Sequence, residues 1–146
     1  MLSFMNMDVV GFCSIETLHL QLNPTCTILI KAPNGKGKST ILSALVWAIY
    51  GKNLKGVSDV NTWKEVRPKD YKGTMVQVFF QKDTHTYKII RCQKYEEVLE
   101  DGAKGKDRLV FIKDGDIIDI KGKGKIQDAI NREIGLSYTL FMNSIM

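Results

Sequence analysis

The chain has 146 residues, of which 44% are apolar and 25% charged, and its formal net charge is +5. This composition predicts a single compact domain over residues 1–146 with its own hydrophobic core. No apolar segment approaches the roughly 20 residues that a membrane-spanning helix needs, which argues against a membrane protein. The three cysteines, Cys13, Cys26 and Cys92, are too few and too scattered for a disulfide framework, so we expect free thiols in a reducing compartment such as the cytoplasm.

The first third of the chain predicts three strands. "MLSFMNMDVVGF" is apolar but has no basic residues before it, which favours a first strand over a signal peptide. Leu18, Leu20 and Leu22 alternate with polar residues and indicate a half-buried strand before the turn at Asn23-Pro24. Residues 26–32, "CTILIKA", are mostly apolar or β-branched and predict a strand buried on both faces.

A glycine-containing loop and a helix follow. Apolar residues recur there at helical spacing, which predicts a helix from about Lys38 to Tyr50 that ends at Gly51. Residues 52–73 are polar, basic and irregular, and we expect no central strand in them.

The second half predicts antiparallel strands and then two helices. Residues 74–81 and 85–92 have strand patterns, with a turn at residues 82–84 and a charged loop at 96–107. In residues 108–120, apolar segments flank Asp114-Gly115, which suits a hairpin turn with positive φ. Helices are expected at 126–134 and 137–145, separated by Gly135, with Ser137 capping the second.

The segment "KAPNGKGKST", residues 31–40, predicts a phosphate-binding loop. A strand, a glycine-containing turn and a helix start would aim backbone amides and a positive helix end at an anion. Gly35 and Gly37 allow close backbone approach, Lys38 can reach the β- and γ-phosphates, and the Ser39 hydroxyl can bind Mg²⁺. The predicted nucleotide-binding set is Asn34, Gly35, Lys36, Gly37, Lys38, Ser39 and Thr40. Ala32 stands where the usual pattern has its first glycine.

A second string, "KGKGK" at residues 121–125, does not meet the same requirements. Ile126 occupies the position that needs a hydroxyl, so we expect a solvated turn before a helix and no second nucleotide site. Contacts of Lys121, Lys123 and Lys125 with a DNA backbone remain an open alternative.

Other basic residues also raise the question of DNA binding. They are Lys52, Lys55, Lys64, Arg67, Lys69, Lys72, Lys104, Lys106 and Arg108. A solvated face explains them, and non-specific phosphate contacts are the alternative. His19 and His85 stand alone in the sequence and predict no metal site, while Asp116 and Asp119 are expected to be exposed hairpin residues.

The phosphate loop and its surroundings resemble a known family. Residues 32–40, "APNGKGKST", are similar to the "GPNGxGKST" loop of ABC-type ATPases. The segments "VVGFCSIETLHLQL" and "ILSALVWAIYGK" resemble the opening and the first helix of SMC-like proteins. The tail, "IGLSYTLFMNSIM", resembles the segment before the Q-loop in the SbcC and Rad-fifty family, which includes phage recombination-endonuclease ATPase subunits.

The resemblance implies an α/β P-loop NTPase fold of the ABC-ATPase type, with mixed and antiparallel strands around the P-loop helix. It implies the N-terminal half of an ATPase head, ending just before the Q-loop, that binds ATP and Mg²⁺ and contains no catalytic residue of its own. The implied partners are the C-terminal half of the head, a nuclease subunit, double-stranded DNA and a second head that dimerises through ATP. Alone, the chain would hydrolyse little ATP.

One residue departs from this family, and other functions stay open. Cys13 stands where relatives often carry an arginine associated with nucleotide contact, so a contact from that segment is not expected. The alternatives are a stand-alone P-loop kinase for small molecules, a non-catalytic assembly module, and a fragment of a different SMC-type or ABC-type ATPase.

Overall fold

The structure, a computed structural model, describes residues 2–12, 15–21, 36–52, 73–95, 108–118 and 122–145. In chain order its elements are β1 (Leu2–Phe12), β2 (Ile15–Gln21), α1 (Lys36–Tyr50), β3 (Thr74–Lys82), β4 (His85–Gln93), β5 (Arg108–Lys113), β6 (Asp116–Ile117), α2 (Lys123–Ile134) and α3 (Tyr138–Ile145). None of these helices is long and apolar enough to cross a membrane.

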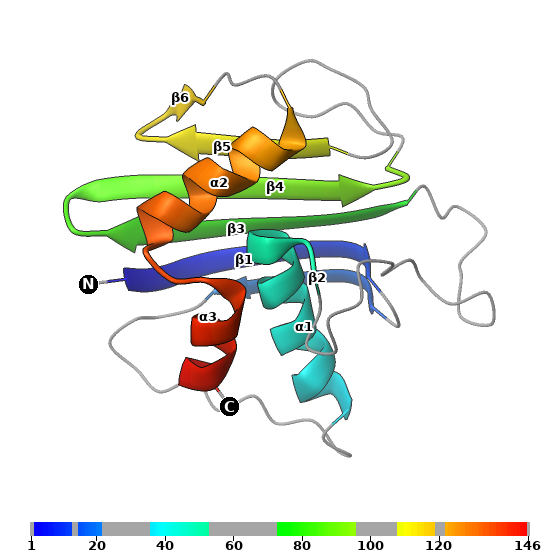
Figure 1. The fold of residues 1–146 in the computed structure, drawn as a ribbon. Helices are drawn as coiled ribbons and strands as arrows, with labels where there is room; N and C mark the ends of the chain where they lie inside the picture. Colours follow the sequence, from blue (N-terminus) through cyan, green and yellow to red (C-terminus); the bar gives the residue numbers. More distant parts are fainter. Residues whose placement is uncertain are drawn as a thin grey trace.

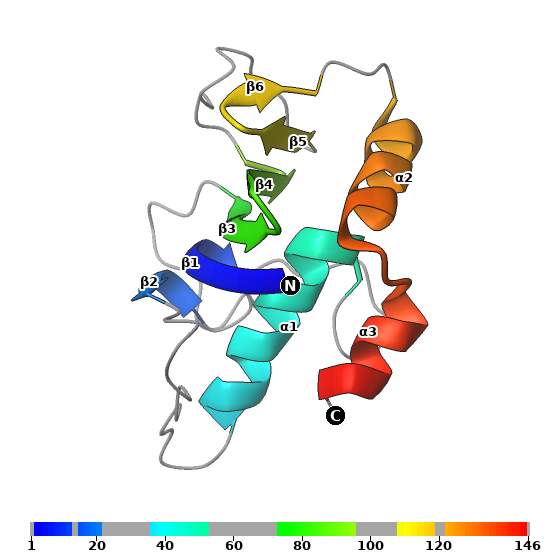
Figure 2. The same ribbon diagram turned by 90° about the vertical axis from the view of Figure 1, so that its left-hand side faces the viewer.

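The strands of the described residues form one sheet with the order β2-β1-β3-β4-β5-β6, and every neighbouring pair is antiparallel. The three helices lie on the same face of this sheet (Figures 1 and 2). Because α1 lies between β2 and β3 in the chain, β1 pairs with β3 only after the chain has passed through this helix. The sheet is curved, and α1 and α2 pack on one of its faces.

Alternation of side chains decides which face of each strand is buried. In β3, Thr74, Val76, Val78 and Phe80 are buried, and the residues between them are only partly buried. This is the pattern that a period of two residues produces. Phe80, Tyr87 and Phe111 stack across β3, β4 and β5, with ring centroids 4.8 and 5.7 Å apart.

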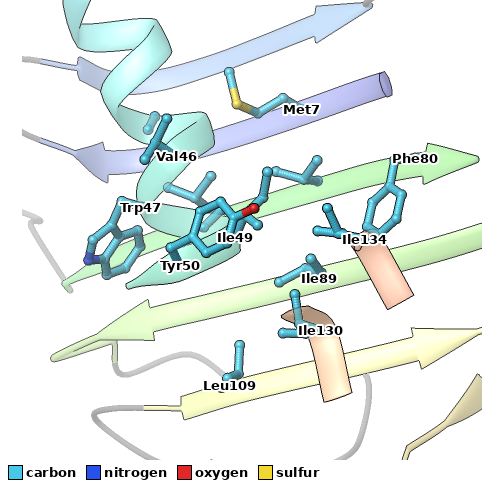
Figure 3. Close-up of a cluster of buried hydrophobic side chains, with 14 of the residues drawn as sticks. Met7, Val46, Trp47, Ile49, Tyr50, Phe80, Ile89, Leu109, Ile130 and Ile134 are labelled. Carbon is cyan, nitrogen blue, oxygen red and sulfur yellow. The ribbon is translucent and has the colours of Figure 1, made fainter. Parts of the chain in front are cut away.

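The main hydrophobic core lies between the sheet and the helices (Figure 3). Val46, Trp47 and Ile49 of α1 and Ile130 of α2 are at most 2% exposed and pack on strand residues such as Ile89. A smaller cluster, made of Ile90, Cys92, Val110 and Ile112, lies on the opposite face of β4 and β5. Cys92 is a buried free thiol, as expected.

Two tight connections occur where the sequence predicts them. Asp114 and Gly115 have φ values of 51° and 85° and join β5 to β6. Gly135 ends α2 in the left-handed conformation, and its N–H donates to the Asn131 carbonyl at 2.8 Å. Ser137 precedes α3, and its hydroxyl accepts a hydrogen bond from the Leu140 amide at 3.2 Å. These predictions are confirmed.

Several predicted boundaries are wrong. α1 starts at Lys36 instead of Lys38, and α2 starts at Lys123 instead of Ile126, so Lys123–Lys125 form a helical turn and not a solvated turn before the helix. Both helices open with lysine and glycine, so apolar spacing gave no sign of these first turns. The predicted strand at 26–32 and the segments 53–72 and 96–107 lie outside the described residues.

Candidate nucleotide-binding site

The predicted phosphate loop leads directly into α1. Residues 31–35, which include Asn34 and Gly35, lie outside the described part of the chain, whereas residues 36–40 form the start of the helix. The first four N–H groups of an α-helix have no carbonyl partner within the helix. A set of backbone donors suited to a phosphate therefore lies within the second half of the predicted loop, where α1 begins.

The charge at the start of α1 favours a bound anion. The first turn contains no acidic residue, while the sequence there supplies Lys36 and Lys38. Cations at the positive end of a helix dipole are unfavourable, by about 0.3–1 kcal/mol each when exposed. An anion bound at this end would be attracted both by the lysine charges and by the helix dipole, and this attraction would offset the repulsion between them.

The body of α1 is held firmly against the sheet. Ala44, Val46, Ala48 and Ile49 are fully buried, and the Trp47 ring packs on Phe12 of β1 with centroids 5.8 Å apart. α1 approaches β1, β3 and β4, as Figure 2 shows. Burial of this size fixes the helix axis, so the position of its first turn is set by packing further along the helix.

The far end of α1 is capped by side chains from other elements. The Gly51 amide donates to the Trp47 carbonyl at 2.7 Å, with Gly51 at φ 78°. Arg91 of β4 donates from Nε to the Ala48 carbonyl at 3.0 Å and from Nη2 to the Ile49 carbonyl at 3.4 Å. The last turn of α1 has no basic residue of its own, so Arg91 supplies the cation that complements the negative end of the helix.

Arg91 was missed in the sequence analysis. It lies in phase with Tyr87 and Ile89 on the core face of β4, and its enclosure lowers the pKa of the guanidinium to about 10, which leaves it charged at neutral pH. A charged residue at a core-facing strand position was the signal that could have identified it. The sequence could not show that its partners would be carbonyls of α1.

Comparison with known proteins assigns the family. The family model described as "AAA domain" matches residues 7–144. The chain belongs to this AAA domain family. The chain is also 28% identical over 145 residues to exonuclease subunit 2 of Escherichia phage RB69, an alignment that covers 98% of the chain and 23% of that relative. The chain thus spans about a quarter of the length of this relative.

Solved structures support the fold of this AAA domain. Structures of the recombination mediator protein RecF with ATPrS and with ATP, from the RecFOR pathway, each have a TM-score of 0.56 and 20% sequence identity. They cover 86% of this chain, and the chain covers 29% and 30% of theirs. The predicted α/β fold of a P-loop ATPase is confirmed, as is the resemblance to the N-terminal ATPase segment of the SbcC and Rad-fifty family.

Each of the two histidines of the AAA domain contacts one carboxylate in the structure. His19 Nδ1 contacts the Asp8 carboxylate across β1 and β2, and His85 Nδ1 lies 2.6 Å from Asp114 Oδ2. Strand pairing creates both contacts, which sequence separation concealed. Within the described residues, no group of three His, Cys, Asp or Glu side chains could hold a metal ion. Asp116 is exposed, as expected, and Asp119 lies outside the description.

The basic residues considered for DNA contact are only partly described. Lys52 and Lys125 are exposed, and Arg108 is partly buried at the start of β5. Lys123 contributes its backbone to the first turn of α2. The Lys52 ammonium lies over the Tyr138 ring, 5.7 Å from its centroid. Lys55, Lys64, Arg67, Lys69, Lys72, Lys104, Lys106 and Lys121 lie outside the described residues.

Proposed function

We propose that this AAA domain binds MgATP at residues 34–40 and is the N-terminal half of an ATPase head that acts in DNA double-strand-break repair or recombination. The observation that carries the proposal is the junction of the glycine–lysine loop with α1, whose first turn lacks acidic residues and whose axis is fixed by a buried core. In this arrangement the backbone amides and Lys38 bind the phosphates, and the Ser39 hydroxyl binds Mg²⁺.

A nuclease subunit is the proposed partner of the complete head. The supporting observation is the name of the phage relative, exonuclease subunit 2, of which the chain covers 23%. The general base for hydrolysis and the remaining ATP contacts are proposed to come from the C-terminal half of the head and from a second head that dimerises through ATP. This AAA domain alone should therefore bind ATP without turning it over at an appreciable rate.

Calorimetric titration of the 146-residue chain with MgATP tests the site. Lys38→Ala should weaken binding by tenfold or more, about 1.4 kcal/mol, because it removes the charge that contacts the β- and γ-phosphates. Lys36→Ala removes the same charge from the same turn, but only the backbone of Lys36 is assigned to the site, so its effect should be within about threefold. Equal affinity of the Lys38→Ala variant and the parent would show that the loop is not the site.

Mg²⁺ binding and DNA binding have separate tests. Ser39→Ala should abolish the increase in ATP affinity that Mg²⁺ produces while leaving metal-free binding nearly unchanged. Non-specific binding of double-stranded DNA, for which Lys52 and Lys125 are exposed candidates, should weaken steeply with salt. A DNA affinity or heparin retention that does not depend on salt would argue against phosphate contacts.

A further inference from the structure

The C-terminal end of α1 joins elements that are distant in sequence. β4 contributes Arg91, which donates to the carbonyls of Ala48 and Ile49. α2 contributes Gln127, whose Nε2 donates to the Ile49 carbonyl at 2.8 Å. Together with the Gly51 amide, these groups satisfy three of the last four carbonyls of α1, which have no partner within a helix.

Gln127 is held in one orientation by this network. Its Oε1 accepts a hydrogen bond from Arg91 Nη2, and its Nε2 donates both to the Ile49 carbonyl and to Asn131 Oδ1, the latter at 3.0 Å. Rotating the amide by 180° would place NH₂ against the guanidinium and oxygen against the carbonyl. The link between α1 and α2 is therefore directional and specific.

A second contact on the same end of α1 reaches the segment that joins α2 to α3. The Tyr50 hydroxyl donates to the Leu136 carbonyl at 2.7 Å, and the Tyr50 ring packs edge-on against Tyr138 and Phe141. Figure 3 shows Tyr50 beside Trp47 and Ile49 at the end of α1, in the same buried cluster as Ile130 and Ile134 of α2. A change in the stability of the end of α1 would therefore affect the packing of both α2 and α3.

We propose that Arg91 and Gln127 couple the nucleotide site to α2, with Arg91 as a positioning residue for α1. The inference rests on the proposed function. α1 has 15 residues, which makes it about 22 Å long, and a packed helix of this length moves as a rigid body. Phosphates that bind the first turn would stabilise the whole of α1, including its last turn, where Arg91 holds it to β4 and Gln127 holds it to α2.

Hydrogen exchange of the 146-residue chain, with and without MgATP, tests the coupling. In the parent, MgATP should slow exchange at the start of α1 and also in α2, the latter by about fivefold or more. Gln127→Leu should keep the effect on α1 and lose most of the effect on α2, since the Tyr50 contact with the Leu136 carbonyl remains. Arg91→Lys keeps the charge but loses the planar fork, so it should retain part of the α2 response.

Lys82→Met is the matched control. Lys82 Nζ donates to the carbonyls of Glu133 and Ile134 at the end of α2, at 2.7 and 3.2 Å, and no described contact joins it to α1. This change should raise exchange in α2 equally with and without MgATP, so the ratio should not change. A merely structural role for Gln127 would give the same result as this control.

Two outcomes overturn the inference, and they separate it from the proposed function. If MgATP protects the start of α1 in both the parent and Gln127→Leu, and the α2 ratio is the same in both, the coupling is wrong and the nucleotide site stands. If MgATP changes exchange nowhere in the parent, the nucleotide site itself is wrong, and the coupling falls with it. Gln127→Leu changes one partly buried side chain, so the test does not depend on the folding of an Arg91 variant.

Discussion

The Arg91 guanidinium occupies the space in which a side chain at Gly51 would begin. A Cβ built on Gly51 would lie 3.0 Å from Arg91 Nη1 and 3.4 Å from its Cζ. Gly51 also has φ 78°, a left-handed conformation that disfavours other residues. The absence of a side chain at Gly51 therefore allows both the left-handed turn that ends α1 and the close approach of Arg91 to the last carbonyls of this helix.

Gly51→Ala should destabilise the domain by about 2–3 kcal/mol, because the backbone strain adds to displacement of Arg91. Urea denaturation measures the free energy of unfolding. Gly115→Ala is the control: its φ is 85°, but a Cβ there meets nothing within 4 Å, so only the backbone cost of about 1–2 kcal/mol applies. Equal losses in the two variants would mean that Arg91 moves aside freely.

Gly73→Ala should abolish folding or cost more than about 4 kcal/mol, since a Cβ at Gly73 would lie 2.0 Å from the Lys94 carbonyl oxygen. Backbone atoms cannot move aside as a flexible side chain can.

By contrast, a Cβ added at Gly124, in the exposed first turn of α2, would meet nothing within 4 Å. Gly124→Ala should stabilise the domain by about 0.5–1 kcal/mol through helix propensity. Thermal and urea unfolding compare both variants with the parent.

Ile130→Ala should lower the free energy of unfolding by about 2–5 kcal/mol, because it leaves a cavity between α2 and the sheet. Ile130 is fully buried in the main core. Leu140 of α3 is 56% exposed, and Leu140→Ala should change stability by less than about 0.5 kcal/mol. Denaturant titration of both variants gives the comparison, and similar losses would contradict the placement of the core.

Glu133 should stabilise the fold only while it is ionised. Its carboxylate accepts hydrogen bonds from the Tyr87 hydroxyl at 2.8 Å and from Lys113 Nζ at 3.2 Å, and these hold the pKa of Glu133 below its ordinary value of 4.5. The unfolded chain therefore binds the proton first as the pH falls. This stabilisation is complete above pH 4.5 and is lost as the pH falls through the folded pKa.

Glu133→Gln keeps an acceptor for Tyr87 but removes the charge. The parent should be more stable than this variant near neutral pH, and the difference should shrink as the pH falls below 4.5. Urea denaturation across this range measures it. A difference that stays constant with pH would show that the carboxylate charge contributes nothing.

Local patterns in the sequence predict much of the sheet, because a strand face or a tight turn is determined by neighbouring residues. Val76 and Val78 reveal the buried face of β3, and Asp114-Gly115 reveals the hairpin. The starts of α1 and α2 were missed, because the sequences that begin at Lys36 and Lys123 open with lysine and glycine and carry no apolar signal.

Contacts between distant segments could not be derived in this way. Arg91 reaches Ala48 only because β4 lies beneath the end of α1, and the sequence gives no register between a strand and a helix. The pairing of His19 with Asp8 likewise depends on the register of β1 and β2. At the candidate site, the loop motif was visible in the sequence, whereas the capping of the opposite helix end was not.

The strand order also has a consequence for how the molecule assembles. β3, β4, β5 and β6 follow one another both along the chain and across the sheet, so β4, β5 and β6 can each pair with the strand that precedes it. β1 must instead find β3 across a segment that contains all of α1, and closing so long a loop costs more chain entropy and slows folding. During synthesis, β1 can pair with β3 only after β3 has left the ribosome. Until then, α1 lacks the part of the sheet that β3 contributes to its packing.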